Sequence, residues 1–321
     1  MKPRVRAIVL DAAGPGYADG LAAAFPEVGF HVCTDYADLE PAIAAHAPEV
    51  ALVFRVGTAP FPRDRLVESG PFRWIQTSAA GIDHIRPWDP ARVTVTNGSG
   101  VYSEAIAQYV LGAVLAFNQR FPLYARQQAQ RLWRKHENRS ITGQTLTVVG
   151  FGDIGRATGD LARRAGMRVI GVRARPQDAP PGITVVGSDG LTDAVAVADH
   201  VAVCLPLTTA TRGMVGAAAF AAMRPGAHLV DVSRGGVVDE AVLLAALRDG
   251  RLAHATLDVF AREPLPAESP FWDLPNVTLT PHSSGDAEGW RTRVVDLFAG
   301  NLRLFLDGRP LRNVVDPVRG Y

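Results

Sequence analysis

The stretch that decides the fold is Leu146–Gly155, which reads LTVVGFGDIG. A short run rich in Val and Leu leads into three glycines with G-x-G-x-x-G spacing, Gly150, Gly152 and Gly155. A helical apolar pattern follows, and a second β-rich run comes at Arg168–Val172. This order predicts a nucleotide-binding βαβ unit that holds a pyrophosphate at the helix N-terminus. The alternative is an ordinary βα turn whose glycines are incidental.

The end of the second strand bears on the choice of cofactor. A dinucleotide fold that prefers NAD carries Asp or Glu about 20 residues beyond the glycines, where it bonds the ribose. This chain carries Arg173 and Arg175 there instead. Because a guanidinium pairs with phosphate in a two-pronged contact, the two arginines favour NADP. The competing interpretation, two solvated residues at a strand end, leaves NAD possible.

The composition is that of a soluble globular protein with room for two domains. The chain has 321 residues, of which 47% are hydrophobic and 20% charged. Its formal net charge of +1 gives no electrostatic reason to expect nucleic acid or a membrane as a partner. No apolar run approaches the ~20 residues that span a bilayer. Cys33 and Cys204 belong to no C-x-x-C motif. We therefore expect a cytoplasmic protein with buried, reduced thiols and no metal site.

Residues 1–97 alternate β-rich and helical patterns, which predicts a parallel sheet covered on both faces. Strands are expected at Val5–Leu10, His31–Thr34, Val50–Phe54, Arg73–Thr77 and Val93–Thr96, with helices at Gly20–Phe25 and Leu39–Ala45. Because this part lacks the glycine motif, we expect it to be an α/β unit separate from the nucleotide fold. Its loop of small residues at Thr77–Asp83 either turns backbone N–H groups toward an anion or is a plain turn.

A long helical pattern begins after residues 97–100, ends near Phe121 and Pro122, and suits a hinge between two units. The βα alternation continues with strands at Ile183–Val186, His200–Leu205, Ala227–Val232, His254–Leu257 and Val277–Thr280, and helices at Leu191–Ala198, Gly216–Met223, Asp239–Arg248 and Glu288–Leu306. Residues 120–139 are rich in arginine, which usually indicates a solvated face. The alternative is an arm that packs on a second subunit with Trp133 as its anchor.

Polar side chains follow three of the strands predicted in the second half of the chain. Arg234 follows one strand and precedes two glycines, Asp258 and Glu263 follow the next, and His282 follows the last. Because ligands bind at the carboxyl ends of strands in an open parallel sheet, we expect these side chains in one crevice. Arginine holds a carboxylate in a two-pronged pair, and histidine exchanges protons near neutral pH. Each residue alone could equally be a surface ion-pair partner, a loop residue or a turn cap.

These residues and the glycine turn resemble those of the D-2-hydroxyacid dehydrogenase family. The matching segments are TVVGFGDIGR at 147–156, CLPLT at 204–208, DVSRGGVVDE at 231–240, LDVFAREPLP at 257–266 and TPHSSG at 280–285, with a weaker match in AAGIDHI at 79–85. The resemblance covers most of the chain and is strongest from about Thr142 to Gly285.

The resemblance implies a role for each residue. Arg234 would bind the substrate carboxylate, with His282 as the acid/base and Glu263 as its partner. Asp258 would support the nicotinamide end, and the backbone of Ala80 and Gly81 would cradle the carboxylate from the other domain. Further cofactor contacts are expected from Asp153, Ile154, Leu205, Pro206, Thr211, Val232, Ser233 and Ser284.

The implied fold has two α/β lobes. A flavodoxin-like parallel-sheet substrate domain would comprise residues 1–99 and 286–321, and a Rossmann-type doubly wound nucleotide-binding domain would comprise residues 100–285. Members of the family are usually dimers through the nucleotide lobe, so a homodimer is expected.

The predicted activity is hydride transfer between NAD(P)H, with NADP preferred, and a small 2-oxo acid or D-2-hydroxy acid such as glyoxylate or hydroxypyruvate. Ser283 and Ser284 replace the family's commoner apolar and small pair, which leaves the substrate open. An alternative within the family is oxidation of another small anion such as phosphite; the presence of Glu263 argues against formate, whose branch replaces it. From another class, the alternative is a nucleotide-sensing corepressor or scaffold on the dehydrogenase fold.

Overall fold

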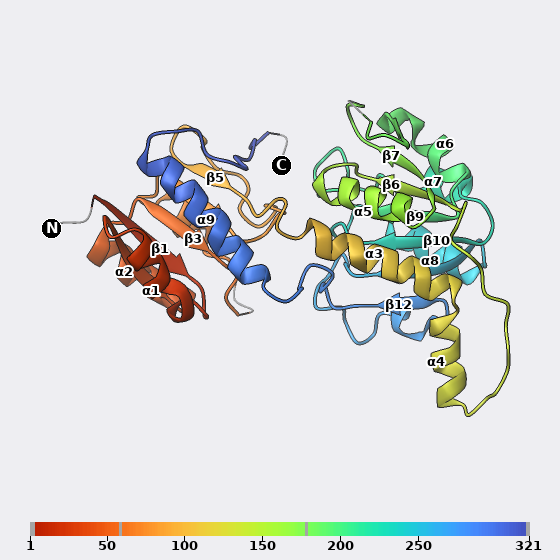
Figure 1. Ribbon diagram of the computed structural model, residues 1–321. Coiled ribbons are helices and arrows are strands. Elements are labelled where there is room, and N and C mark those ends of the chain that lie inside the picture. Colours follow the sequence, from red (N-terminus) through yellow and green to blue (C-terminus); the bar gives the residue numbers. More distant parts are fainter. Residues whose placement is uncertain (1–3, 58–59, 177–178, 319–321) are drawn as a thin grey trace. The chain divides into compact units, whose positions relative to one another are not determined.

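The structure, a computed structural model, describes residues 4–57, 60–176 and 179–318. Contacts divide the chain into two compact units, unit 1 formed by Met1–Val101 and Glu288–Tyr321 and unit 2 formed by Tyr102–Ala287. Each unit contains a parallel sheet with helices, so the predicted α/β fold class is confirmed (Figure 1). The boundaries expected from the sequence follow residues 99 and 285.

Unit 1 contains a five-stranded sheet of order β2-β1-β3-β4-β5 with all strands parallel. Its strands are β1 (Val5–Leu10), β2 (Val28–Cys33), β3 (Val50–Val53), β4 (Trp74–Thr77) and β5 (Thr94–Thr96). Its α-helices are α1 (Pro15–Ala24), α2 (Leu39–His46) and α9 (Trp290–Leu306), with a 3-10 turn at Tyr36–Asp38 and a π turn at Asp64–Glu68. This strand order is that of flavodoxin-like folds.

The C-terminal helix α9 covers one face of this N-terminal sheet (Figure 1). Neighbouring residues on β4 point to opposite faces. Trp74 stacks on Phe298 of α9, with 5.2 Å between ring centroids. Ile75 packs instead in the core that contains Leu39 of α2. The last segment of the chain therefore completes the first domain.

Unit 2 contains a seven-stranded parallel sheet of order β12-β11-β10-β9-β6-β7-β8. Its strands are β6 (Thr145–Val149), β7 (Arg168–Val172), β8 (Ile183–Val186), β9 (His200–Val203), β10 (Ala227–Asp231), β11 (Leu252–Leu257) and β12 (Val277–Leu279). Its α-helices are α3 (Ser103–Asn118), α4 (Phe121–Ala129), α5 (Asp153–Arg164), α6 (Leu191–Ala196), α7 (Ala217–Ala222) and α8 (Glu240–Arg248), with 3-10 turns at Ser188–Gly190 and Pro270–Asp273.

Helices cover both faces of the sheet of unit 2. Val110 of α3 and Ala162 of α5 pack with Val148 of β6 in one core. The next residue, Val149, points into a second core that is lined by α6, α7 and α8. Chain order reverses between β6 and β9, since β7 and β8 lie on one side and β10 to β12 on the other. Ligands of such folds bind outside the carboxyl ends of the strands at this switch point.

Two elements of unit 1 begin earlier than the sequence predicts. Helix α1 starts at Pro15 rather than Gly20, because proline fits the first helical turn, where its missing N–H group costs no hydrogen bond. Strand β2 starts at Val28 rather than His31, because pairing with β1 extends it through Gly29.

Cys33 is fully buried as expected, whereas Cys204 is only half-buried.

The arginine-rich stretch 120–139 begins with α4, which has Pro122 in its first turn. Beyond α4 the chain has no helix or strand until β6, and Leu132 and Trp133 are 49% and 95% exposed. These apolar side chains therefore take no part in the core of unit 2. Among the described residues, no helix is long and apolar enough to cross a membrane.

Candidate active site

The glycine turn lies at the switch point of the sheet of unit 2. Gly150 follows β6 with φ +102°, and a Cβ atom there would lie 2.7 Å from the carbonyl carbon of Cys204, just past β9. At Gly155 a Cβ would lie 2.1 Å from the carbonyl oxygen of Gly150, so α5 packs tightly on the turn. Gly152 caps α5 and has open space around its missing Cβ. The turn thus leaves the N-terminus of α5 accessible to an anion such as a pyrophosphate.

The residues expected to recognise the adenosine end follow β7. Arg173 is half-buried, and its backbone N–H donates to the carbonyl of Val186 at 3.1 Å. Arg175 is exposed. Both residues belong to the segment directly past the carboxyl end of β7, next to the strand that carries the glycine turn. This is where the second strand of a dinucleotide fold meets the ribose.

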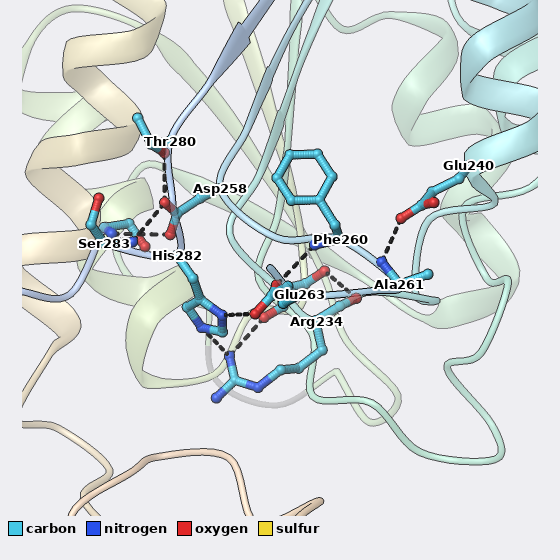
Figure 2. Close-up of polar contacts among 11 residues, drawn as sticks. Arg234, Glu240, Asp258, Phe260, Ala261, Glu263, Thr280, His282 and Ser283 are labelled. Atoms are coloured by element: carbon cyan, nitrogen blue, oxygen red, sulfur yellow. Dashed lines mark hydrogen bonds and ion pairs between the residues drawn. The ribbon is translucent and has the colours of Figure 1, made fainter. Parts of the chain in front are cut away.

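Three side chains that follow β10, β11 and β12 meet at the carboxyl ends of these strands (Figure 2). His282 Nδ1 lies 2.7 Å from Glu263 Oε2. Because a carboxylate only accepts hydrogen bonds, Nδ1 carries the proton in this pair. The opposite nitrogen, Nε2, lies 3.5 Å from Nη1 of Arg234. The imidazole is therefore oriented by Glu263 and presents Nε2 to a ligand held beside Arg234.

Glu263 is a partly exposed carboxylate held from two sides. Its second oxygen accepts the backbone N–H of Phe260 at 2.9 Å. Burial alone would raise the pKa of Glu263, but the hydrogen bonds from His282 and Phe260 and the charges of His282 and Arg234 outweigh it and lower that pKa. Glu263 is therefore ionised at neutral pH, which fixes the tautomer and the orientation of the His282 ring.

The Arg234 side chain depends on a turn that starts at the end of β10. Ser233 donates both its N–H and its hydroxyl to Oδ1 of Asp231, and Arg234 Nη1 donates to the carbonyl of Ser233 at 2.8 Å. Gly235 follows, and a Cβ there would lie 1.9 Å from the carbonyl oxygen of Phe260. Only glycine lets this turn pack against the segment that carries Glu263.

Asp231 is a buried carboxylic acid beneath this turn. Burial raises its pKa to about 7 even though the hydrogen bonds from Ser233 lower it, and the charges of Glu240 and Asp258 add to the rise. Sequence reasoning did not single out Asp231, because nothing in its strand pattern distinguishes a buried acid from a polar strand end.

Asp258 is fully buried and holds the turn that contains His282. Its Oδ1 accepts the hydroxyl of Thr280 at 2.5 Å and the N–H of Ser283 at 2.8 Å, and its Oδ2 accepts the N–H of Ser284 at 3.0 Å. Figure 2 shows Thr280 and Ser283 next to this carboxylate. His282 itself has φ +54°, which is uncommon for a non-glycine residue and needs support from its surroundings.

The structure places the other predicted cofactor residues along the same sheet edge. Leu205, Pro206 and Thr211 lie in the loop after β9, where Thr211 Oγ1 donates to the carbonyl of Pro206 at 2.6 Å. Val232, Ser233 and Ser284 are buried at the ends of β10 and β12, and Asp153 and Ile154 open α5. Ala80 and Gly81 lie in unit 1, after β4, where Asn97 Nδ2 donates to the carbonyl of Ala80 at 2.7 Å.

Sequence reasoning missed two hydroxyl side chains of the site. Thr280 stands directly before Pro281 and His282, and only the contact with Asp258 reveals its role. Tyr109 lies on α3, and its hydroxyl is 2.6 Å from Thr280 Oγ1. No sequence signal marks Tyr109, because its position on the helix equally suits a core residue. Among the described residues, no group of three or more His, Cys, Asp or Glu side chains is arranged to hold a metal ion.

Known proteins resemble this chain over most of its length. Residues 111–284 match the family described as D-isomer specific 2-hydroxyacid dehydrogenase, NAD binding domain. A glycerate dehydrogenase of Methylorubrum extorquens is 30% identical over 84% of this chain and 85% of its own length. A glyoxylate reductase of Korarchaeum cryptofilum is 31% identical over 78% of each chain.

Solved structures give the same result. A D-isomer specific 2-hydroxyacid dehydrogenase from Xanthobacter autotrophicus Py2, in complex with NADPH and MES, is 32% identical with a TM-score of 0.85 over 99% of each chain. An NADPH-dependent glyoxylate/hydroxypyruvate reductase from Sinorhizobium meliloti, in complex with NADP and sulfate, is 26% identical with a TM-score of 0.84 over 99% of this chain and 100% of its own. The chain belongs to the D-isomer specific 2-hydroxyacid dehydrogenase family.

Proposed function

We propose that this protein transfers a hydride between NAD(P)H and the carbonyl carbon of a small 2-oxo acid, reversibly, to give a D-2-hydroxy acid. The observation that carries the proposal is the convergence of Arg234, Glu263 and His282 on the sheet edge that also bears the glycine turn. A guanidinium, an imidazole and an orienting carboxylate are the groups that binding and protonating a 2-oxo acid require.

Each residue has a separate task in this reaction. The nicotinamide supplies the hydride when the cofactor is bound, and the glycine turn with the N-terminus of α5 would hold its pyrophosphate. Arg234 binds the substrate carboxylate and so orients the carbonyl group. His282 gives a proton from Nε2 to the carbonyl oxygen, and Glu263 stabilises the positive charge that the ring carries before that transfer.

The remaining residue roles are those that the family resemblance implies. Asp258 holds the His282 turn, and we assign it the support of the nicotinamide end. The remaining cofactor contacts are those expected after β9, β10 and β12, which Leu205, Thr211, Val232, Ser233 and Ser284 would make. We assign unit 2 as the nucleotide domain and unit 1 as the substrate domain. The backbone of Ala80 and Gly81 would then bind the substrate carboxylate from unit 1.

We further propose NADP as the preferred cofactor. Arg173 stands where an acid would bond the ribose hydroxyls, so nothing at that position repels a 2′-phosphate. Arg175 adds a second guanidinium nearby. The structures from Xanthobacter autotrophicus Py2 and Sinorhizobium meliloti are described with NADPH and NADP, which supports this choice.

Glyoxylate and hydroxypyruvate are the substrates proposed first. Relatives bear the names glyoxylate reductase and glyoxylate/hydroxypyruvate reductase. A homodimer is proposed as the working form, with the exposed Trp133 as a contact on the second subunit. Both cysteines are free, which fits a reducing compartment, and we place the protein in the cytoplasm.

The test is a panel of 2-oxo acids assayed with NADPH and with NADH. We expect absorbance of the reduced cofactor to fall with at least one small 2-oxo acid, faster with NADPH. Phosphite with NADP or NAD is the control for the other small-anion activity. Tight cofactor binding without turnover of any compound would contradict the proposal and favour a nucleotide-sensing scaffold.

A further inference from the structure

A relay of two hydroxyl groups leads from helix α3 to Asp258. Tyr109 Oη lies 2.6 Å from Thr280 Oγ1, and Thr280 Oγ1 donates to Asp258 Oδ1 at 2.5 Å. A threonine hydroxyl has one hydrogen, and Thr280 uses it on Asp258. Tyr109 must therefore be the donor to Thr280, so the relay runs in one direction, from Tyr109 through Thr280 to Asp258.

The far end of the relay is the backbone around His282. The two oxygens of Asp258 accept the N–H groups of Ser283 and Ser284, directly after the histidine, while Thr280 lies directly before the Pro281–His282 dipeptide. One carboxylate thus bonds residues on both sides of a histidine whose φ is +54°. If the carboxylate rotates, the turn loses the bonds that hold this unfavourable backbone conformation.

The near end of the relay is fixed in the protein. Tyr109 is half-buried on α3, between Ile106 and Val110, which pack in the core of unit 2. Burial raises the pKa of Tyr109 to about 12, although the hydrogen bond to Thr280 lowers it by more than the charge of Asp258 raises it. The phenol therefore stays protonated at neutral pH and remains a hydrogen-bond donor.

We propose that Tyr109 and Thr280 are positioning residues for the reduction of the 2-oxo acid. Their relay sets the rotation of the Asp258 carboxylate, which in turn fixes the His282 turn so that Nδ1 stays on Glu263 and Nε2 faces the substrate. The inference rests on the proposed function, and it assigns a catalytic consequence to two side chains that act through Asp258.

Kinetics of four variants test the relay. Thr280→Val keeps the shape but removes the bond to the carboxylate, and we expect kcat to fall about 10- to 100-fold. Thr280→Ser keeps the hydroxyl and should retain most of the activity. Tyr109→Phe removes one neutral hydrogen bond and should lower kcat about 3- to 10-fold. The double variant Tyr109→Phe/Thr280→Val should be no slower than Thr280→Val, because Tyr109 acts only through Thr280.

The chain offers a matched control two residues away on the same segment. The hydroxyl of Thr278 lies 3.0 Å from Nε2 of His254 rather than near Asp258, so Thr278→Val should keep the parent kcat. KM for NADPH should also stay at the parent value in Thr278→Val. Independent, multiplying losses in the double variant, or a Thr280→Val enzyme with the parent kcat, would overturn the relay.

A readout that needs no turnover separates this inference from the proposed function. The imidazole nitrogen resonances of His282, assigned with His282→Gln, should move in Thr280→Val and stay in place in Thr278→Val. If the parent protein reduces no 2-oxo acid, the proposed function fails, and these resonances alone decide on the relay. An unmoved His282 resonance in Thr280→Val would refute it.

Discussion

His282 and the trio formed by His200, His228 and His254 occupy opposite ends of one sheet and opposite environments. His282 follows β12, its side chain is 40% exposed, and a carboxylate lies against it. The trio stands in the amino-terminal halves of β9, β10 and β11, in cross-strand register, with exposures of 1%, 0% and 6%. The same kind of side chain therefore packs at one end of the sheet and, in the proposed reaction, exchanges protons at the other.

The trio forms a cluster of neutral rings beside Phe117 of α3. His200 Nδ1 lies 3.2 Å from His228 Nδ1, whose Nε2 lies 3.1 Å from Thr256 Oγ1. The ring of Phe117 stacks on His228 with 4.6 Å between centroids. Two imidazoles share a hydrogen bond only when one of them accepts, so the pair is held with at least one neutral ring. What separates the two ends is access to water and to a partner of opposite charge.

The largest effect is expected for the loss of the His282 imidazole. His282→Ala should lower turnover of the 2-oxo acid by about 10²- to 10⁴-fold, the usual contribution of a general acid, while NADPH binding stays close to the parent. Steady-state kinetics and a fluorescence titration of NADPH measure the two quantities. Turnover at the parent rate would remove His282 from the mechanism.

The second effect concerns the buried histidines and the pH dependence of the free energy of unfolding. Burial lowers the pKa of His200 to about 4, against a smaller rise from Asp199 and with a further fall from Arg139. Burial also lowers the pKa of His254 to about 4, helped by the charge of Arg126. As the pH falls, these histidines are protonated in the unfolded chain before they are protonated in the folded protein. Their contribution to the free energy of unfolding is therefore complete above about pH 6.5 and is lost toward pH 4, by about 3 kcal/mol for each histidine.

His254→Leu isolates this contribution. Urea unfolding at pH 6.5 and at pH 4 should show a loss of stability that is smaller than the parent's by about 3 kcal/mol. The difference between the two proteins is the useful quantity, because Asp231, whose pKa is raised, contributes a slope of the opposite sign. An identical acid dependence in both proteins would mean that His254 is not held neutral.

The third effect concerns Arg234, whose guanidinium lies beside the His282 ring. Arg234→Lys keeps the charge but loses the planar fork, so we expect KM for the 2-oxo acid to rise, kcat to fall and kcat/KM to drop about 10- to 100-fold. Acid stability between pH 6.5 and 4 should not change. A lysine variant with the parent kinetics would reduce Arg234 to a point charge.

The smallest effect concerns the choice of cofactor at Arg173, directly after β7. One charge-assisted contact with a 2′-phosphate favours NADPH by roughly ten-fold, and solvent exposure reduces that value. We expect the preference in kcat/KM for NADPH over NADH to reverse in Arg173→Asp, because the acid repels the phosphate and accepts the ribose hydroxyls. Equal kcat/KM values in the parent would show that Arg173 and Arg175 are solvated strand-end residues.

Local patterns in the sequence predicted most of the fold and the residues that lie around His282. The glycine turn, the strand ends and the motifs around Arg234, Glu263 and His282 are short segments whose chemistry can be read without distant contacts. Element starts were predicted less well where pairing or capping decides them, as at Pro15 and Val28. The cluster of His200, His228 and His254 was not predicted, because its members come from three strands whose register cannot be read from the sequence.

The sequence by itself determined the family, the α/β class and the order of the residues that meet at the sheet edge, because these depend on turn chemistry and on the direction of parallel strands. Only the tertiary structure decided which side chains are buried and which donors face Asp258, since both depend on contacts between distant segments. The Tyr109 hydroxyl reaches Thr280 across 171 positions of the chain. Burial and cross-strand register, rather than residue type, separate the partly exposed His282 from the three histidines that pack.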